Sequence, residues 1–214
     1  MKFLYGIYGA NIPVIREFDI PADNKFEAGE VVTMSTDNVI SKNAIGPAVG
    51  VAAEDHSGEK DILNERSNGT KLRIDITGGG VYSVPAIRLT ATNKGTATSF
   101  ICDDENINAG LSGAKLVLVS KGENSVNTDS VGMMRKVQSV SVSAGVASFV
   151  LDNGGVTDVG DVYALILNPG FKGYVSNDGK NFTCSGGSGI NLTVMGYDEK
   201  TLTLEVLLGS KFYE

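Results

Sequence analysis

Two runs of the chain alternate strictly between apolar and polar side chains. In the run KLRIDI, Leu72, Ile74 and Ile76 alternate with charged residues, and the run TLTLEVLL at 201–208 has the same period of two. Successive side chains of a β-strand point to opposite faces, so this period predicts strands with one buried and one solvated face. Other runs rich in Val, Ile and Thr predict further strands at 30–34, 47–52, 81–91, 114–120, 136–144, 146–152, 161–167 and 190–197.

Segments rich in Gly, Asn, Asp and Ser separate these runs. Asn68-Gly69, Asn153-Gly154 and Asp178-Gly179 indicate two-residue hairpins, because both central positions of a type I′ turn need positive φ. Only residues 59–65 (EKDILNE) have a helical pattern, and folds that alternate strands with helices need a helix after most strands. We therefore predict an all-β protein of β-barrel or β-sandwich-like modules, with long turn-rich loops and very little helix.

The chain of 214 residues is long enough for one large β domain or two small ones. We expect residues 1–22 to form an extended N-terminal arm and residues 23–98 to form a β module. Residues 99–214 then supply further strands of the same or of a second β domain. The boundary is placed at 92–99 (TNKGTATS), where small and polar residues predominate.

Charge and hydropathy exclude several classes of partner. A formal net charge of −7 argues against nucleic acid, because contacts to phosphates need clustered Lys and Arg. No apolar run approaches the roughly 18 residues of a membrane span, and Gly6 and Gly9 interrupt the apolar start, which is not expected to be a signal peptide. Cys102 and Cys184 have no metal-binding spacing; we expect two buried free thiols, with a disulfide as the alternative.

Three consecutive glycines, Gly78 to Gly80, lie between two predicted strands. A glycine loop that binds phosphate presents its backbone N–H groups at the start of a following helix. Here the glycines are followed by VYSVPAIRL, a strand pattern that contains a proline. They are therefore predicted to form a turn or bulge that binds nothing.

The chain contains no recognisable catalytic motif. His56, the one histidine, lies in a polar segment and is predicted to be a surface loop residue, and no G-x-S-x-G motif supplies a serine nucleophile. Carboxylates are clustered at 102–106 (CDDEN) and 152–161 (DNGGVTDVGD), but neither cluster has the EF-hand order, so Asx turns explain them more simply than calcium does. We expect no enzymatic activity, no catalytic residue, no metal and no cofactor.

Three motifs follow one another in the first half of the chain: GEVV at 29–32, VGVA at 49–52 and GGVYSVP at 79–85. In the second half, LSGAKLVLVSKGENS and DVGDVYALILNPGFKG are a strand and a strand–turn pattern. This order of motifs resembles that of the head decoration, or capsid-stabilising, proteins of tailed bacteriophages.

The resemblance implies a mechanical function in a phage or prophage virion. Such proteins bind the outside of an assembled capsid, often as trimers, and bridge neighbouring capsid subunits. For this chain the resemblance implies a homo-oligomer, with a trimer favoured, whose partner is the major capsid protein or another virion protein. The protein would be made in the cytoplasm of a bacterial host and located on the capsid exterior.

The apolar start of the chain is the candidate partner-binding site. Glycines would let it extend over a neighbouring subunit and add a strand to a sheet edge. The residues proposed to bind are Phe3, Leu4, Tyr5, Ile7 and Tyr8. The alternative is an ordinary first strand packed in its own core. Two other functions fit the same composition: another virion part (neck, tail or fibre base), or a cell-surface adhesion or sugar-binding β module.

Overall fold

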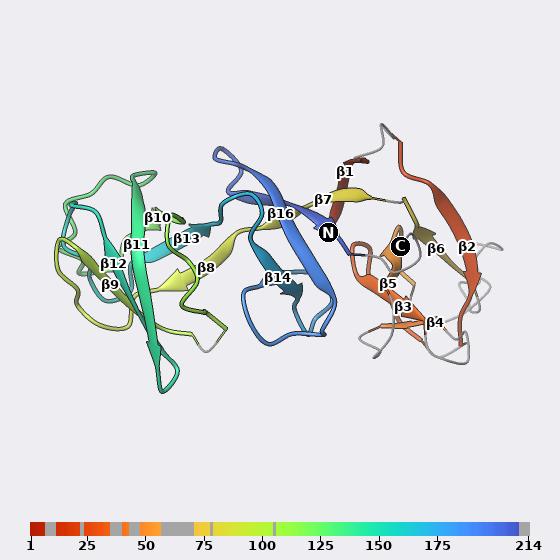
Figure 1. Ribbon diagram of the computed structural model, residues 1–214, viewed down its shortest axis with the longest axis horizontal. Helices are drawn as coiled ribbons and strands as arrows, with labels where there is room; N and C mark the ends of the chain where they lie inside the picture. Colours follow the sequence, from red (N-terminus) through yellow and green to blue (C-terminus); the bar gives the residue numbers. More distant parts are fainter. Residues whose placement is uncertain are drawn as a thin grey trace.

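Strands are the only regular elements in the part of the chain that this computed structural model describes, which is residues 1–6, 12–21, 24–34, 40–42, 48–56, 71–77, 79–104 and 106–209. They form three antiparallel sheets that follow one another along the longest axis of the molecule (Figure 1). The predicted all-β fold is confirmed. The helical pattern at 59–65 lies outside the described residues, and no described helix could cross a membrane.

The terminal sheet lies at one end of the molecule and has five strands in the order β2-β6-β5-β3-β4. These are β2 (Ile15–Asp19), β3 (Val31–Met34), β4 (Ile40–Lys42), β5 (Ala48–Ala52) and β6 (Lys71–Asp75). Leu72 and Ile74 are fully buried, as their alternation predicts. Asp75 was expected on the solvated face but is buried. Its carboxylate accepts hydrogen bonds from the Thr77 N–H (3.0 Å) and the Thr77 hydroxyl (2.6 Å), which compensate for the loss of water.

The central sheet combines the first and last strands of the described chain. Its order is β1-β7-β17-β16-β14-β15. The strands are β1 (Lys2–Gly6), β7 (Gly80–Pro85), β14 (Lys172–Val175), β15 (Phe182–Thr183), β16 (Asn191–Asp198) and β17 (Thr203–Leu208). The predicted strand at 81–91 is divided at Ala86, whose N–H donates to the Leu202 carbonyl at 3.0 Å. Its second half, β8, belongs to the next sheet, so one bent stretch of chain connects the two (Figure 1).

The third sheet has the order β8-β13-β10-β11-β12-β9. Its strands are β8 (Ile87–Thr90), β9 (Ser99–Asp103), β10 (Lys115–Ser120), β11 (Met134–Ser143), β12 (Val146–Leu151) and β13 (Val162–Ile166). The sheet curls until its edges approach each other, where the Thr92 N–H donates to the Ile101 carbonyl at 3.1 Å. The segment 92–99, expected to mark a boundary, joins two strands of this one sheet.

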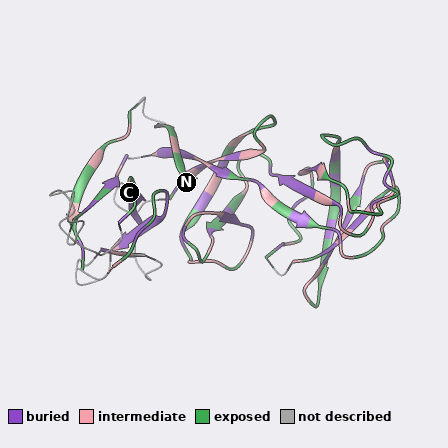
Figure 2. Cartoon of the chain, turned by 180° about the vertical axis from the view of Figure 1, so that it is seen from behind, coloured by how far each residue is buried: buried purple, intermediate pink, exposed green. Residues whose placement is uncertain are grey.

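Buried and exposed positions alternate along many strands (Figure 2), as in β17, where Leu204, Val206 and Leu208 are buried. The buried apolar residues form two clusters. The larger cluster spans the central and third sheets and also includes Val31, Ala48 and Val51 of β3 and β5 in the terminal sheet. The smaller cluster, which includes Leu72 and Ile74, lies within the terminal sheet. Loss of packing in the smaller cluster is therefore expected to affect the terminal sheet more than the other two sheets.

The predicted hairpin turns are confirmed only in part. Asp178-Gly179 lies in the loop that joins the paired strands β14 and β15, so a hairpin forms there. The loop spans residues 176–181 and only Gly179 has positive φ, so the predicted two-residue turn is wrong. Asn153-Gly154 joins β12 to β13, which are not neighbours in the sheet, so the hairpin prediction is wrong there. Asn68-Gly69 lies outside the described residues. A tight hairpin forms instead at Ala144-Gly145, between β11 and β12, where φ is 49° and 80°.

Candidate functional site

The apolar start of the chain forms β1, an edge strand of the central sheet. It pairs antiparallel with β7, from Lys2 opposite Ser83 to Gly6 opposite Gly80. The backbone of three of the predicted contact residues therefore lies within the protein's own sheet, which is the alternative that the sequence left open. Ile7 and Tyr8 lie outside the described residues, as does the side chain of Tyr5.

The side chains of Phe3 and Leu4 lie in different surroundings. Phe3 is half-buried and packs edge-on against Tyr82, with 5.8 Å between ring centroids. Leu4 lies where the register with β7 shifts, and 37% of its surface is exposed. Phe3 thus attaches β1 to the core, whereas Leu4 presents an apolar side chain to solvent.

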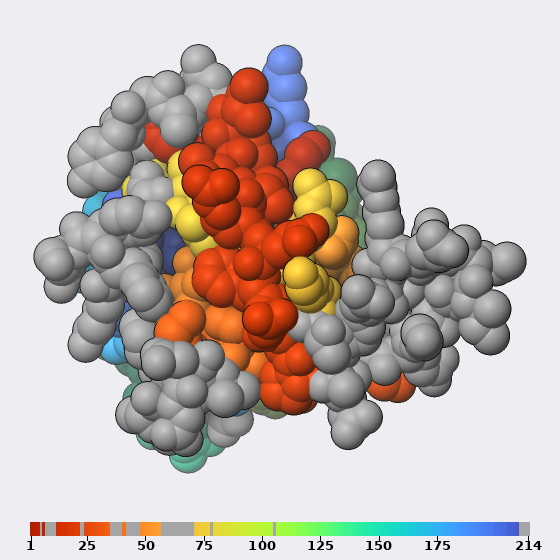
Figure 3. Space-filling model, turned by 90° about the vertical axis from the view of Figure 1, so that its right-hand side faces the viewer, coloured from red at the N-terminus to blue at the C-terminus, as the bar shows by residue number. Residues whose placement is uncertain are grey.

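Further along the N-terminal part, Ile12 and Val14 are also exposed, at 78% and 42%. They lead into β2, which runs across the middle of the molecular end shown in Figure 3. The Val14 N–H donates to the Thr77 hydroxyl at 2.8 Å, so the backbone here is held against the turn after β6. The N-terminal part therefore combines an anchored backbone with solvent-facing apolar side chains.

The glycine run forms the turn between β6 and β7, as predicted. Gly79 has a φ of +65°, and the Gly80 N–H donates to the Thr77 carbonyl at 3.0 Å, while Gly78 lies outside the described residues. A strand follows the turn, so these glycines do not form the strand–loop–helix arrangement of a phosphate site. A Cβ at Gly80 would lie 2.8 Å from the Tyr82 hydroxyl, which explains a glycine there too.

We expect Gly79→Ala to lower the free energy of unfolding by about 1 kcal/mol, because a Cβ disfavours the left-handed backbone region. Urea unfolding followed by circular dichroism measures this loss. Gly110→Ala is the matched control, since Gly110 does not have positive φ and its nearest atom to a new Cβ is 3.4 Å away. Equal losses in the two variants would contradict this account, as would micromolar ATP or phosphate binding that Gly79→Ala abolishes.

His56 is not a surface loop residue, so that prediction is wrong. Its exposed fraction is 9%, and its backbone exchanges two hydrogen bonds with Phe26, of 2.8 and 2.9 Å. Its Nδ1 lies 3.1 Å from the Asn24 carbonyl oxygen. The histidine therefore connects the segment after β5 to the segment before β3. Its backbone pairs with Phe26, and its ring lies beside the Asn24 carbonyl of the same segment.

Both cysteines are free and buried, as expected. Burial raises the pKa of Cys102 and of Cys184 to about 12, with nearby carboxylates contributing in the same direction. The thiolate is the reactive form of cysteine, so these thiols are unreactive at neutral pH.

The carboxylates at 152–161 belong to a buried polar network. Asp161 accepts hydrogen bonds from the backbone of Gly122 and Asp158 (both 3.0 Å) and from the Asn127 amide (2.8 Å). Burial raises its pKa, but these bonds, with one from Ser125, outweigh burial and leave the pKa below its usual value. The described residues contain no group of three or more His, Cys, Asp or Glu placed to hold a metal ion. The hydrogen bonds that the Asp161 carboxylate accepts from these loops are sufficient to explain an aspartate at this position.

Arg135, which the sequence did not single out, is at the centre of this network and only 1% exposed. Its guanidinium donates to the carbonyls of Gly155 (3.0 Å), Asp152 (2.7 Å) and Ala97, and lies 3.9 Å from the Asp129 carboxylate. A signal was present in the sequence: Arg135 has the same strand parity as the buried Val137. Through these contacts, Arg135 of β11 holds the loops at 121–133 and 152–161 against the third sheet.

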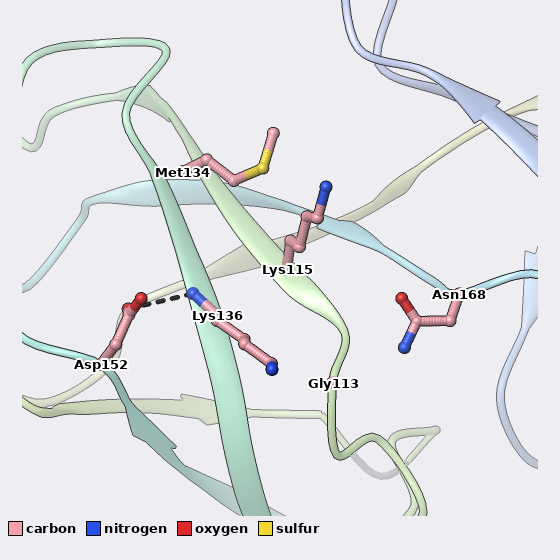
Figure 4. A pocket seen from close by; sticks show the side chains of 6 residues that line it. All are labelled: Gly113, Lys115, Met134, Lys136, Asp152 and Asn168. Carbon is pink, nitrogen blue, oxygen red and sulfur yellow. Dashed lines mark hydrogen bonds between the residues drawn. The ribbon is translucent and has the colours of Figure 1, made fainter.

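A hollow of about 520 Å³ lies beside β10 and β11 (Figure 4). Lys115 and Lys136 are direct cross-strand partners, and in Figure 4 their side chains diverge while Asn168 points back toward them. The Lys115 ammonium donates to the Tyr197 hydroxyl at 2.6 Å, which raises its pKa, and lies 3.5 Å from Glu199. A lysine held protonated in this way is not a nucleophile.

A second hollow, of about 370 Å³, lies between the β14–β15 loop and the segment after β9. Its lining includes the amide and carboxylate side chains of Asp104, Asn106, Asn177, Asp178 and Asn181. Asp178 is already occupied, because it accepts hydrogen bonds from the Lys180 N–H (2.8 Å) and from the Asn181 amide (2.7 Å). The remaining polar groups are of the kind that binds hydroxylated small molecules.

No family model matches this chain, and neither a curated protein nor a solved structure matches it. The function has to be inferred from the residues and their arrangement.

Proposed function

We propose that this chain is a non-enzymatic structural protein of a phage or prophage virion, specifically a head decoration protein that binds the outside of the assembled capsid and stabilises it. The observation that carries the proposal is the location of the three motifs on the framework strands β3, β5 and β7. Within them, Val31 lies opposite Val51 in adjacent strands, and Val84 is fully buried. The motif residues therefore help to build the rigid framework that the proposed function requires.

The proposed mechanism is mechanical. A rigid β framework that contacts neighbouring capsid subunits adds binding free energy across their joints, and several contacts made by one oligomer reinforce one another through effective concentration. We propose a homo-oligomer, with a trimer favoured, bound to the major capsid protein or another virion protein on the capsid exterior. The protein would reach this place after synthesis in the bacterial host cytoplasm.

Within the candidate partner-binding site, Leu4 is the described residue best placed to contact the capsid. It is exposed on an edge strand, whereas Phe3 is occupied by the packing against Tyr82. Tyr5, Ile7 and Tyr8 remain proposed contacts on the same segment. Deleting the segment would remove β1 from the central sheet, so a point substitution separates binding from folding better than a truncation does.

We expect Leu4→Asp to weaken capsid binding about tenfold or more, because burying a leucine side chain is worth about 1.5–3 kcal/mol. The measurement is co-sedimentation with expanded, undecorated heads of the parent phage. Val131→Asp is the matched control, since Val131 is 62% exposed and lies in the third-sheet region instead.

Two outcomes would contradict the proposal at different levels. Equal binding by Leu4→Asp and the unchanged protein would remove Leu4 from the contact but leave the decoration function. Failure of the unchanged protein to bind any capsid would overturn the decoration function in favour of another virion part or a surface role.

Sugar binding is the second candidate function, and the amide-lined hollow beside Asn177 and Asn181 favours it. A glycan array probed with the unchanged protein tests it. A specific signal lost in Asn177→Ala, together with no capsid binding, would support the surface role over the virion role.

A further inference from the structure

Strand β11 is longer than the strand beside it. Its first three residues pair with β10, from Met134 opposite Val117 to Lys136 opposite Lys115, and β12 pairs with it as far as Ser143. Residues 112–114 hydrogen-bond the next two residues of β11, Val137 and Gln138. The Gly113 N–H donates to the Val137 carbonyl at 2.8 Å, and the Ser112 hydroxyl donates to the Gln138 carbonyl at 2.9 Å. Beyond Gln138, the described part of the chain supplies no hydrogen bond to the outer side of β11. The β11–β12 hairpin projects from the sheet in both Figure 1 and Figure 2.

The two-residue turn at Ala144-Gly145 determines which backbone groups face outward. In such a turn the flanking residues, Ser143 and Val146, form the hydrogen-bonded pair. Hydrogen-bonded and non-hydrogen-bonded pairs alternate along an antiparallel ladder. The N–H and C=O groups of Val140 and Val142 therefore point away from β12. We call residues 139–143 of β11 the free edge.

The free edge lacks most devices that keep sheet edges from pairing with other chains. Its sequence is SVSVS, and no charged residue or proline occurs between Lys136 and Asp152. The only irregularity is the register shift between Val137 and Ser139, at its base. Native edges usually carry a lysine, a proline or an inward-pointing charge that blocks strand addition. No described strand other than β12 pairs with residues 139–143, and Val142 is 38% exposed, so this edge is open to another strand.

The sequence of the free edge is symmetric about Ser141. If two copies of the edge run antiparallel with a two-fold axis at Ser141, Val140 lies opposite Val142 of the partner subunit. These are the residues whose backbone groups face outward, so each such pair exchanges two hydrogen bonds. The valines then meet on the core-facing side and the serines on the other. A neutral edge also lets two copies of a chain with net charge −7 approach without repulsion at the contact.

We propose that the free edge pairs with the same edge of a second copy of this chain, forming a two-fold dimer in which the third sheet continues across the interface. This interface goes beyond the proposed function and does not depend on capsid binding: it concerns the free chain in solution, whereas the trimer is proposed for the capsid-bound state. It also differs from a trimer contact, because an isologous two-fold interface closes with two subunits.

A disulfide trap tests the register. Ser141 would face Ser141 of the partner subunit in a non-hydrogen-bonded pair, where Cα atoms are about 4.5 Å apart, a distance that a disulfide spans. We expect Ser141→Cys to form a covalent dimer on mild oxidation, seen on a non-reducing gel. Ser143→Cys is the matched control, because its two copies would lie about 13 Å apart in this register. The native thiols are buried and protonated, so they do not contribute.

Analytical ultracentrifugation of the full chain tests the interface itself. We expect a concentration-dependent dimer, and we expect Val142→Lys to raise its dissociation constant at least about tenfold through a charge on the edge. Val150→Lys adds the same charge on β12, at a residue 45% exposed but flanked by strands on both sides, and should leave the constant unchanged.

A monomer at several hundred micromolar, equal responses to the two lysines, or a trimer insensitive to Val142→Lys would each overturn the proposal. Loss of capsid binding in Val142→Lys, with the unchanged chain monomeric, would also overturn it and assign the edge to a capsid segment. If circular dichroism shows that Val142→Lys is unfolded, the serine-to-cysteine pair decides: equal cross-linking, or none in either variant, contradicts the dimer.

Discussion

Replacing Arg135 with Met will lower the free energy of unfolding by about 3–5 kcal/mol, the cost of breaking a buried ion pair from one side. The guanidinium is almost completely buried, and it donates to the carbonyls of Gly155 and Asp152 at 3.0 and 2.7 Å. Removing it leaves those carbonyls without this donor and leaves the Asp129 carboxylate buried without its counter-charge. Chemical unfolding in urea, followed by circular dichroism, measures the loss.

Two comparisons isolate the cause. Lys136→Met alters the next residue of β11, whose side chain is exposed, and should change stability by less than about 0.5 kcal/mol. Adding Asp129→Asn to Arg135→Met should recover part of the loss, because it removes the uncompensated charge. A loss below about 1 kcal/mol in Arg135→Met would mean that the network does not stabilise the loops around it.

Replacing Ile74 with Ala will cost about 2–5 kcal/mol, because it leaves a cavity in a core that does not fully relax. Ile74 is completely buried in the smaller core cluster, which includes Leu72 and Val32. Its side chain also packs on Gly50, where an added Cβ would approach the Ile74 Cγ2 to 2.9 Å. Since Ile74 belongs to the smaller cluster, the loss should be largest in the terminal sheet, although Val31 and Val51 of that sheet pack in the larger cluster.

Hydrogen exchange detected by mass spectrometry tests where the loss occurs. Amides of β5 and β6 should exchange faster in Ile74→Ala, while those of β10 and β13 should not change. Arg73→Ala is the control on the same strand, because its side chain is 54% exposed and pairs with Glu54 at 3.8 Å near solvent. Equal acceleration in all three sheets would show that the two clusters unfold as one unit.

The strands that were predicted correctly are those whose own residues carry the pattern. KLRIDI alternates over its whole length and TLTLEVLL alternates as far as Val206, and β6 and β17 form there. β9 (SFICD) and β14 (KGYV) were missed because they are short and mix polar residues with apolar ones. Their pairing partners, β12 and β16, supply the order that the local sequence lacks.

The groups that surround the buried Arg135 were beyond local prediction. Asp75 and Arg135 occupy positions where charged residues are normally solvated. Burial is tolerated because other groups satisfy them. Thr77 donates to Asp75 from two residues away, whereas the three carbonyls around Arg135 come from Ala97, Asp152 and Gly155. Sequence spacing contains no record of such contacts, so only the folded chain reveals them.

For the candidate sites, the sequence by itself determined which segments are apolar, neutral or rich in turns. It identified the apolar residues Phe3 and Leu4, and it contains the neutral run SVSVS at 139–143. The tertiary structure decided that Phe3 packs inward and Leu4 faces solvent, because β1 pairs with the distant β7. It also decided that SVSVS is an open edge, because the hydrogen bonds that β10 and residues 112–114 make to β11 end at Gln138 within the described chain. Local side-chain chemistry determines what a strand can pair with, but strand pairing across the fold determines which edges and faces remain open.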